Sequence, residues 1–365
     1  MDFEKKYLNE VINATSALNS ISGRVAWRSP SNIALIKYWG KHGEKYPMNP
    51  SVSLTLNESA TTMRVNYQFH KRADSLRLRY NFSGTSKKSF ATRIESYLLT
   101  LNRFLPFINY MEFEIFSENT FPHSAGIASS ASAFSALALC LAEIEAIIKD
   151  QRKYNDEFFT KASFLARLGS GSACRSVFGG VVLWGNTNGI SGSSDEVALS
   201  IDSLVHPVIR SLRNVILIID NSEKSLSSSE GHALMKNNPF AKIRFKQARV
   251  NLNRLLTIIS EGSMIEFFDL IEYEALTLHA MMMTTYPGYV LMKPLTLEII
   301  EKIREQRKKG VEMGFTIDAG ANVHLLYTQK FEKEVTRFIQ DEIESGIELY
   351  RISDHVGNGP VKLSE

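Results

Sequence analysis

A single aspartate stands where an apolar stretch of the chain gives way to small residues. Asp318 follows the run Phe-Thr-Ile at 315–317 and precedes Ala319 and Gly320. A carboxylate at the end of an apolar strand can be partly desolvated, as a general base or a stabiliser of positive charge requires. The same residue could instead cap the following turn through its own backbone. The segment alone leaves both interpretations open.

An arginine lies in a loop of glycine and serine residues between Gly169 and Ser176. The planar guanidinium of Arg175 is suited to holding a carboxylate with two parallel hydrogen bonds. The alternative is a surface turn with a structural ion pair. Its neighbour Cys174 is expected to be a small buried residue rather than a reactive thiol.

The segment Phe121–Ser132 is dominated by small residues and runs directly into an apolar stretch. Glycine and alanine allow a ligand to approach the backbone closely, and the free N–H groups of a helix's first turn attract anions. The Gly-Lys-Ser/Thr ending of a Walker A loop is absent. The pattern therefore predicts either a different kind of phosphate loop or a helix start chosen for tight packing.

A polar pair, an apolar run and two lysines follow one another in the segment Ser31–Lys41. Lys37 and Lys41 flank Tyr38 and Trp39, and lysines beside an aromatic ring and a glycine can hold a phosphate as point charges. In most proteins such lysines are ordinary solvated charges, so this segment also leaves two interpretations.

Composition places these segments in an ordinary globular protein. The 365 residues are 44% hydrophobic and 22% charged, with a formal net charge of +3. So small a net charge does not favour nucleic-acid or membrane-surface binding. The two cysteines form no CxxC pair, which argues against a disulfide framework or a structural zinc site. The N-terminus lacks the apolar core of a signal peptide, and we expect a cytoplasmic protein.

Periodicity predicts an α+β chain in which strands and helices position these four segments. Expected strands are 24–27, 51–57, 63–69, 76–82, 110–116, 181–184, 215–220, 315–318, 323–327 and 348–352, with 63–69 and 76–82 as antiparallel neighbours. Expected helices are 8–18, 91–104, 135–148, 156–168, 242–260, 264–282, 295–309 and 332–344. The stretch 186–195 is expected to be a surface loop.

Taken in chain order, the four segments closely resemble the mevalonate diphosphate decarboxylase family. This family is a branch of the superfamily that includes galactokinase, homoserine kinase, mevalonate kinase and phosphomevalonate kinase. The string Ile-Lys-Tyr-Trp-Gly-Lys within Ser31–Lys41 separates the branch from the kinases. Phe121–Ser132 resembles its phosphate loop, Gly169–Ser176 its substrate loop and Thr316–Gly320 its catalytic aspartate motif. A further family-like segment, Lys224–Gly231, lies between the last two.

The resemblance implies a reaction and a role for each matching residue. ATP would phosphorylate the C3 hydroxyl of mevalonate 5-diphosphate, phosphate would leave, and the C1 carboxylate would be lost as CO2. Asp318 would be the base or cation stabiliser, Arg175 with Asn32 would hold the carboxylate, and Ser228 would face the transferred phosphoryl group. The substrate diphosphate would be held by Tyr38, Lys41, Ser170, Gly171 and Ser172. ATP and its Mg2+ would be held by Ser124, Gly126, Ser129, Ser130, Ser132 and Lys224, with Ser129 nearest the metal.

The resemblance also implies an architecture. It predicts the fold of these kinases, with an N-terminal domain like the second domain of ribosomal protein S5 and a C-terminal ferredoxin-like domain. We expect an extension at 1–24, an ATP-binding domain at 25–208, a second domain at 209–365 and a homodimer, with the active site between the domains. The chain departs from the family pattern at Ser229, His232 and Ala321.

Two alternative functions remain open at this point. One is a decarboxylase or kinase of another mevalonate route, acting on mevalonate 3-, 5- or 3,5-phosphates. Tyr38 and Lys41 favour a distal diphosphate, although a monophosphate could also use them. The other is a catalytically silent relative, which we would expect to have lost Asp318, Arg175 or the serine loop. All three are present.

Overall fold

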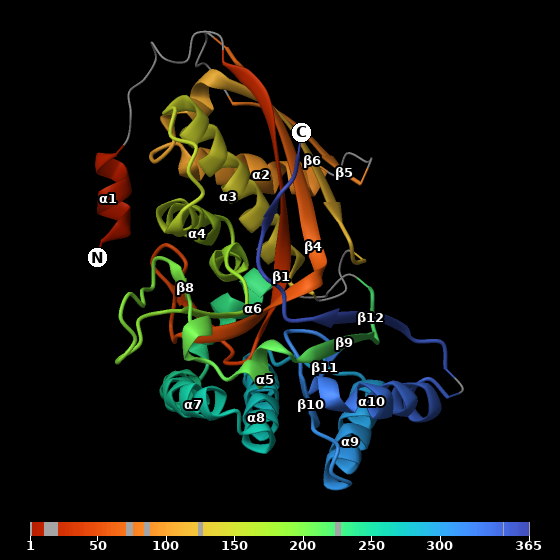
Figure 1. The fold of residues 1–365 in the computed structure, drawn as a ribbon. Coiled ribbons are helices and arrows are strands. Elements are labelled where there is room, and N and C mark those ends of the chain that lie inside the picture. The colour runs from red at the N-terminus through yellow and green to blue at the C-terminus, as the bar shows by residue number, and fades with distance from the viewer. Residues whose placement is uncertain are drawn as a thin grey trace.

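The chain is organised around two β-sheets, one in each half of the molecule (Figure 1). The computed structural model describes residues 2–10, 21–70, 76–83, 88–122, 127–222, 228–345 and 347–364. Helices and strands alternate irregularly along it, and both sheets contain antiparallel pairs. The expected α+β fold class is confirmed.

The N-terminal half is built on a seven-stranded sheet. Its strands are β1 (Ser22–Ala34), β4 (Ser51–Phe69), β5 (Arg77–Phe82), β6 (Met111–Asn119), β7 (Val181–Trp184), β8 (Ala198–Ser200) and β13 (Val361–Lys362). The order is β13-β1-β4-β6-β5, with β7 and β8 continuing from the other half of β4. The two expected strands 51–57 and 63–69 are thus parts of one long strand.

Strand β1 is longer than the expected first strand at 24–27. It continues through the proline to Ala34, and its register against β4 shifts between Pro30 and Asn32. A proline cannot donate to the ladder, and a bulge is one of the places where a strand tolerates it. Because the strand is longer, Asn32 lies within the sheet and the residues that follow lie at the centre of the molecule.

The expected antiparallel pairing of 63–69 with 76–82 is wrong. Strand β6 lies between β4 and β5, and β5 pairs with β6 in parallel. Alternation of apolar and polar residues identifies a strand but carries no information about which neighbour it pairs with. The consequence is that β5 forms the edge of the sheet.

Helices α2 (Lys88–Leu101), α3 (Ser129–Ile148) and α4 (Asp156–Gly169) pack together on one face of this sheet (Figure 1). Helix α3 is long and apolar enough to cross a membrane by composition, but 78% of its most apolar window is buried. It is the core helix of this half. Helix α1 (Phe3–Asn9) packs on α4 through Tyr7; the expected helix at 8–18 falls mostly on residues outside the described ranges.

The C-terminal half contains a four-stranded antiparallel sheet in the order β10-β11-β9-β12. Its strands are β9 (Arg213–Ile218), β10 (Met313–Thr316), β11 (Val323–Tyr327) and β12 (Tyr350–His355). The helices are α7 (Ala241–Glu261), α8 (Met264–Met283), α9 (Pro294–Lys308) and α10 (Glu332–Phe338), which continues as a π-helical turn to Ile343. Each of the four corresponds to an expected helix.

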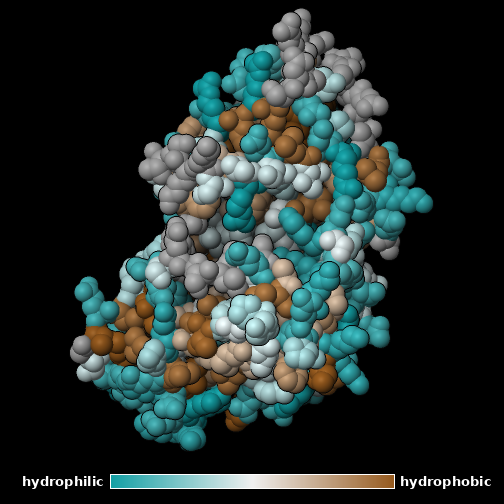
Figure 2. All heavy atoms as spheres, turned by 180° about the vertical axis from the view of Figure 1, so that it is seen from behind, coloured by the Kyte–Doolittle hydropathy of each residue, from teal (hydrophilic) through white to brown (hydrophobic). Residues whose placement is uncertain are grey.

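The two halves share a core. One apolar cluster joins Ile33, Leu35 and Val52 from the first half to Leu252 and Leu255 of α7. The chain also returns to its starting sheet, because Val361 and Lys362 of β13 pair with Arg28 and Trp27. Short elements at the junction are the hairpin β2 (Lys41–His42) and β3 (Tyr46–Pro47), α5 (Pro207–Arg210) and α6 (Ser228–Leu234). Figure 2 shows the two lobes and the narrower waist between them.

Candidate active site

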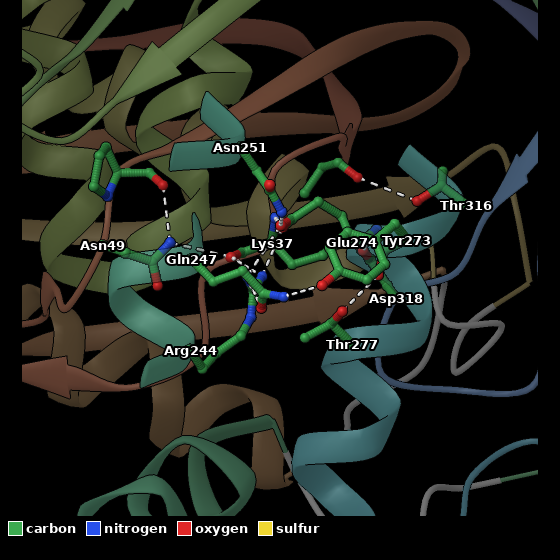
Figure 3. Close-up of polar contacts among 12 residues, drawn as sticks. Lys37, Asn49, Arg244, Gln247, Asn251, Tyr273, Glu274, Thr277, Thr316 and Asp318 are labelled. Atoms are coloured by element: carbon green, nitrogen blue, oxygen red, sulfur yellow. Dashed lines mark hydrogen bonds and ion pairs between the residues drawn. The ribbon is translucent and has the colours of Figure 1, made fainter. Parts of the chain in front are cut away.

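Two segments that are far apart in the sequence meet at the junction of the two lobes. Strand β1 ends at Ala34, and the irregular chain after it buries Lys37. Asp318 enters the same space from the turn that follows β10. Nζ of Lys37 lies 2.6 Å from Oδ1 of Asp318 (Figure 3). A lysine of the N-terminal signature and the candidate catalytic carboxylate therefore form one ion pair across the lobes.

Burial and pairing have opposite effects on the pKa values of Lys37 and Asp318. Burial favours the neutral amine and lowers the pKa of Lys37, although the Asp318 carboxylate opposes that effect. Burial acts to raise the pKa of Asp318, but Lys37 and Arg175 help to outweigh it and hold that pKa below its ordinary value. Asp318 is therefore ionised at neutral pH, as a base or a counter-charge must be.

Two histidines surround Asp318 that the sequence did not single out. Nε2 of His279, on α8, donates to the backbone carbonyl of Asp318 at 3.1 Å. His324, on β11, is buried, and burial lowers its pKa to about 4, so its ring is neutral at pH 7. Both histidines lie within apolar runs, where a histidine is indistinguishable from an ordinary core residue.

Arg175 is fixed in place by polar side chains. It lies in the 3-10 turn Gly171–Val177 and is only 2% exposed. Its Nε and Nη2 both donate to Oδ1 of Asn32, at 3.2 and 3.0 Å, and its Nη1 donates to Oγ of Ser51. Nδ2 of Asn32 donates in turn to Oγ of Ser176 at 2.8 Å. A guanidinium has five N–H donors, so Arg175 keeps two for a ligand while Asn32 sets its orientation.

The ring of Tyr38 covers Arg175 and is held between two other rings. It meets Trp184 edge-on at 4.9 Å and stacks on His232 at 4.9 Å, and the Arg175 guanidinium lies 5.6 Å from its centroid. A Cβ on Gly171 would come within 2.8 Å of the Trp184 ring and 3.0 Å of the Tyr38 hydroxyl, so a larger residue there would displace the rings that hold Tyr38. Burial raises the pKa of Tyr38 to about 12, and its hydroxyl is a neutral donor.

Three cations lie near one another, and one of them, Lys41, lowers the pKa of His232, the ring on which Tyr38 stacks. Lys41 is in β2, Lys45 in the hairpin turn and Arg93 in α2. Burial, together with repulsion from Lys45 and Arg93, lowers the pKa of Lys41 to about 8. Burial and the neighbouring cations also lower the pKa of Lys45. Among the described residues no carboxylate forms an ion pair with any of the three, so the cluster is suited to binding an anion with several charges.

Lys45 and Arg93 were missed at the level of sequence. Lys45 lies just beyond the signature and is anchored by donating to the backbone carbonyl of Gly169 at 2.9 Å. Arg93 comes from a helix with no motif, and its guanidinium lies 5.6 Å from the ring of Phe134. Only the packing of α2 against α3 brings it to the site.

The phosphate-loop segment leads into α3 beside the substrate loop. The hydroxyls of Ser130 and Ser170 lie 3.4 Å apart, so the two loops are in contact. Next to them is a pocket open to solvent, and the space in it, counted together with the solvent at its mouth, is about 450 Å³. Its lining includes Ser129 and Ser130 with the aromatic residues Tyr80, Phe82 and Phe90, as well as Arg93. Hydroxyl groups can bind the phosphates of a nucleotide and aromatic rings can stack on its base, so this lining fits a nucleotide.

Some of the expected nucleotide contacts lie elsewhere. Ser132 is fully buried, and its hydroxyl lies 2.6 Å from Oγ1 of Thr61 in β4. It joins the helix to the sheet and is not available to a nucleotide, because helical period turns it to the opposite side from Ser130. Ser124, Gly126 and Lys224 lie outside the described residues, as does the side chain of Ser228.

The comparisons with known proteins cover almost the whole chain. Residues 29–197 match the diphosphomevalonate decarboxylase-like N-terminal domain, and residues 214–360 match the mevalonate 5-diphosphate decarboxylase C-terminal domain. A diphosphomevalonate decarboxylase from Ganoderma lucidum is 31% identical over 333 residues, which cover 85% of this chain and 80% of that protein. The chain belongs to the diphosphomevalonate decarboxylase family.

Solved structures of diphosphomevalonate decarboxylases share the fold. The Staphylococcus aureus enzyme is 27% identical, covers 94% of this chain over 99% of its own length, and superposes with a TM-score of 0.80. A second structure, 26% identical with a TM-score of 0.78, covers 94% of this chain and all of its own and is a complex of MDDEF with MVAPP, AMPPCP and magnesium. The family and fold expected from the motifs are confirmed.

Magnesium use fits the side chains at the phosphate loop. No group of three or more His, Cys, Asp or Glu residues in the described part of the chain could hold a metal ion alone. Mg2+ seldom needs such a cage, because it keeps several waters and binds through substrate phosphates with few protein oxygens. Ser129, which is half-buried and lines the pocket beside α3, offers a hydroxyl oxygen of this kind.

Proposed function

We propose that this diphosphomevalonate decarboxylase converts mevalonate 5-diphosphate and ATP to isopentenyl diphosphate, CO2, ADP and phosphate. The observation that carries the proposal is the proximity of Asp318 and Arg175: each charge affects the pKa of the other group, and Asp318 is paired with Lys37 at 2.6 Å. A base and a carboxylate clamp side by side suit a substrate whose hydroxyl and carboxylate both react.

Phosphoryl transfer opens the reaction. The C3 hydroxyl attacks the γ-phosphorus of ATP, its proton passes to Asp318, and ADP leaves. Since this chemistry depends mainly on positioning and on neutralising oxygens, the protein contributes fixed charges rather than covalent bonds. Lys37 keeps Asp318 ionised before the transfer and fixes its direction, because the two side chains are paired at 2.6 Å.

Decarboxylation follows when the C3–O bond breaks and phosphate departs. Positive charge develops at C3, and the electrons of the C1–C2 bond move to form the C2=C3 double bond as CO2 leaves. As the C3–O bond breaks, Asp318 returns the proton it holds to the departing phosphate, and the carboxylate regenerated in this way stabilises the developing cation. Arg175, oriented by Asn32 and Ser51, holds the C1 carboxylate through its two remaining donors until that bond breaks.

The substrate diphosphate is assigned to the cation cluster. Lys41 and Tyr38 were expected there, and Lys45 and Arg93 add two further positive charges. A diphosphate carries more charge than a monophosphate, and three desolvated cations that pair with no carboxylate in the described part of the chain favour it. Ser172, which hydrogen-bonds Tyr38, and Ser170 border the same space.

The nucleotide is assigned to the pocket beside α3. Its phosphates would lie against the first turn of α3 at Ser129 and Ser130, and its base among Tyr80, Phe82 and Phe90. When bound, Mg2+ neutralises the phosphate oxygens, with the hydroxyl of Ser129 as a protein ligand.

A homodimer and a cytoplasmic location complete the proposal. Exposed apolar side chains on the outer faces of α7 and α8, Ile243, Val250 and Ile265, support an interface with a second copy. Light scattering of the purified chain would give twice the mass of 41.1 kDa if the dimer forms, and the single mass if it does not.

Substrate choice tests the proposal. The purified chain is supplied with ATP and Mg2+ and, separately, with mevalonate, its 5-phosphate, its 3-phosphate or its 5-diphosphate, and ADP release is followed. The account predicts turnover with the 5-diphosphate and its loss in Asp318→Asn. A clear preference for a monophosphate, or for mevalonate itself, would assign the chain to another mevalonate route.

A further inference from the structure

The backbone of Lys37 is held by side chains rather than by secondary structure. The chain has left the β1 ladder at this point, and the amides of Leu35 and Ile36 still bond to the carbonyl of Val52. The amide of Lys37 instead donates to Oε2 of Glu274 at 2.9 Å, and its carbonyl accepts from Nη2 of Arg244 at 3.2 Å. Buried peptide groups require such partners, so these two side chains replace a strand neighbour.

Glu274 and Arg244 form one rigid unit from neighbouring helices. Glu274 lies on α8 and Arg244 on α7, and they are 0% and 3% exposed. Nη1 and Nη2 of Arg244 donate to Oε1 and Oε2 of Glu274 at 3.0 and 2.6 Å, a two-pronged pairing of fixed geometry. Nδ2 of Asn251 donates to Oε1 at 2.6 Å (Figure 3). Every oxygen of the carboxylate therefore has a partner.

The carbonyl of Lys37 has a second donor on its other side. Nδ2 of Asn49 donates to it at 3.1 Å and also donates to the carbonyl of Pro50 at 2.9 Å (Figure 3). Both peptide groups of this one residue are thus fixed by partners from two lobes. The fixed peptide sets the starting point of the Lys37 side chain, whose Nζ reaches to within 2.6 Å of Oδ1 of Asp318.

We propose that Glu274 and Arg244 are positioning residues for the proposed reaction: they clamp the peptide of Lys37 and so set the direction of the Lys37–Asp318 pair. The inference rests on the proposed function. The clamp lies on helices of the C-terminal half but acts on a residue of the N-terminal half, so the packing of the two halves against each other sets the geometry of the catalytic carboxylate.

The charge of Glu274 acts on the same pair. Charged or titratable groups face Lys37 from each neighbouring element: Asp318, Glu274, Arg244, Arg175, His279 and His324. Of these, the Asp318 and Glu274 carboxylates raise the pKa of Lys37 against the effect of burial. Removing the charge of Glu274 therefore allows that pKa to fall further, and protonated Lys37 is then lost at a lower pH.

The test compares Glu274→Gln with a matched variant on the same helix. Glu272 is also buried on α8 and paired with two arginines, Arg304 and Arg307 of α9, but it makes no contact with the active-site chain. Glu272→Gln therefore reproduces the loss of a buried carboxylate without touching Lys37. Arg244→Lys is the second test variant, since it keeps the positive charge but lacks the planar guanidinium that bonds to both Glu274 oxygens and to the Lys37 carbonyl at once.

Steady-state kinetics with ATP and mevalonate 5-diphosphate give the readout. We expect Glu274→Gln and Arg244→Lys to lower kcat by about 10- to 100-fold with little change in either KM, because a misplacement of about 1 Å can cost a factor of 100. In Glu274→Gln the alkaline limb of the kcat profile moves to lower pH. Glu272→Gln loses thermal stability to a similar extent but keeps kcat and its pH profile.

The outcomes separate the two proposals. An inactive wild-type chain would refute the proposed function itself. An active wild-type chain with kcat unchanged in folded Glu274→Gln would overturn the clamp, as would an equal fall of kcat in Glu272→Gln. If Glu274→Gln does not fold, Arg244→Lys decides, and a normal kcat in that variant overturns the inference.

Discussion

Replacing Asp318 by asparagine removes the partner of a buried ammonium. The Lys37 side chain is 1% exposed, and Asp318 is the carboxylate against its Nζ. The substitution keeps shape and hydrogen-bonding capacity, so its effect on folding reports the lost charge. Glu274 is the other carboxylate that acts on Lys37, and it is already paired with Arg244. We therefore expect the unpaired lysine to lose its proton in the folded variant.

The magnitude follows from this loss of a proton. A lysine that is neutral when folded and protonated when unfolded, with an ordinary pKa of about 10.4, costs roughly 4.6 kcal/mol at pH 7, at about 1.36 kcal/mol per pH unit. Breaking a buried ion pair from one side independently costs about 3–5 kcal/mol. Because the pKa of Lys37 is lowered in the folded state, the folded variant binds fewer protons than the unfolded chain. Its stability therefore rises with pH, and at pH 9 the cost falls to roughly 2 kcal/mol.

Urea unfolding of wild type and Asp318→Asn at pH 7 and pH 9 measures this cost. The double variant Lys37→Met with Asp318→Asn removes both charges, and we expect it to recover most of the lost stability while remaining inactive. An Asp318→Asn variant as stable as wild type at both pH values would refute the reasoning. So would a cost that does not change with pH.

Three further predictions concern the cation cluster and the N-terminal helix. Arg93→Gln should raise KM for the diphosphate substrate by about 10- to 100-fold, the effect of losing about 1.5–3 kcal/mol from a charged hydrogen bond, and because Arg93 also lines the nucleotide pocket, KM for ATP should rise as well. Lys41 has a pKa of about 8 and binds anions only when protonated, so kcat/KM for the diphosphate should fall above pH 8 in wild type and persist to higher pH in Lys41→Arg. Tyr7 is 1% exposed against Phe164, and Tyr7→Ala should lower the free energy of unfolding by about 3 kcal/mol in urea titrations without changing kcat.

Local patterns predicted local structure well. The strand Val181–Trp184 and the start of α8 at Met264 agree with the expected residues, because each is a run of one periodicity with clear ends. Pairing was harder to predict. The parallel pairing of β5 with β6 and the return of β13 to β1 depend on contacts between segments with no sequence signal for each other.

The same distinction holds for the site. Asp318, Arg175 and Lys41 could be selected because each lies in a motif whose composition suggests chemistry. The pairing of Lys37 with Asp318 spans 281 positions, and no periodicity links them. Arg93, His279 and Glu274 lie on helices where a charged or polar residue has no distinguishing neighbours. These three residues could be assigned to the site only once the structure showed how their helices pack around the segment that follows β1.

Measuring CO2 and ADP in the same reaction tests the central claim most directly. Mevalonate 5-diphosphate labelled at C1 is mixed with ATP, Mg2+ and an excess of the protein, and both products are quantified through a single turnover. The account predicts one labelled CO2 for each ADP, and neither product from Asp318→Asn. ADP without labelled CO2 would contradict it, because the cleft would then transfer phosphate without breaking the C1–C2 bond.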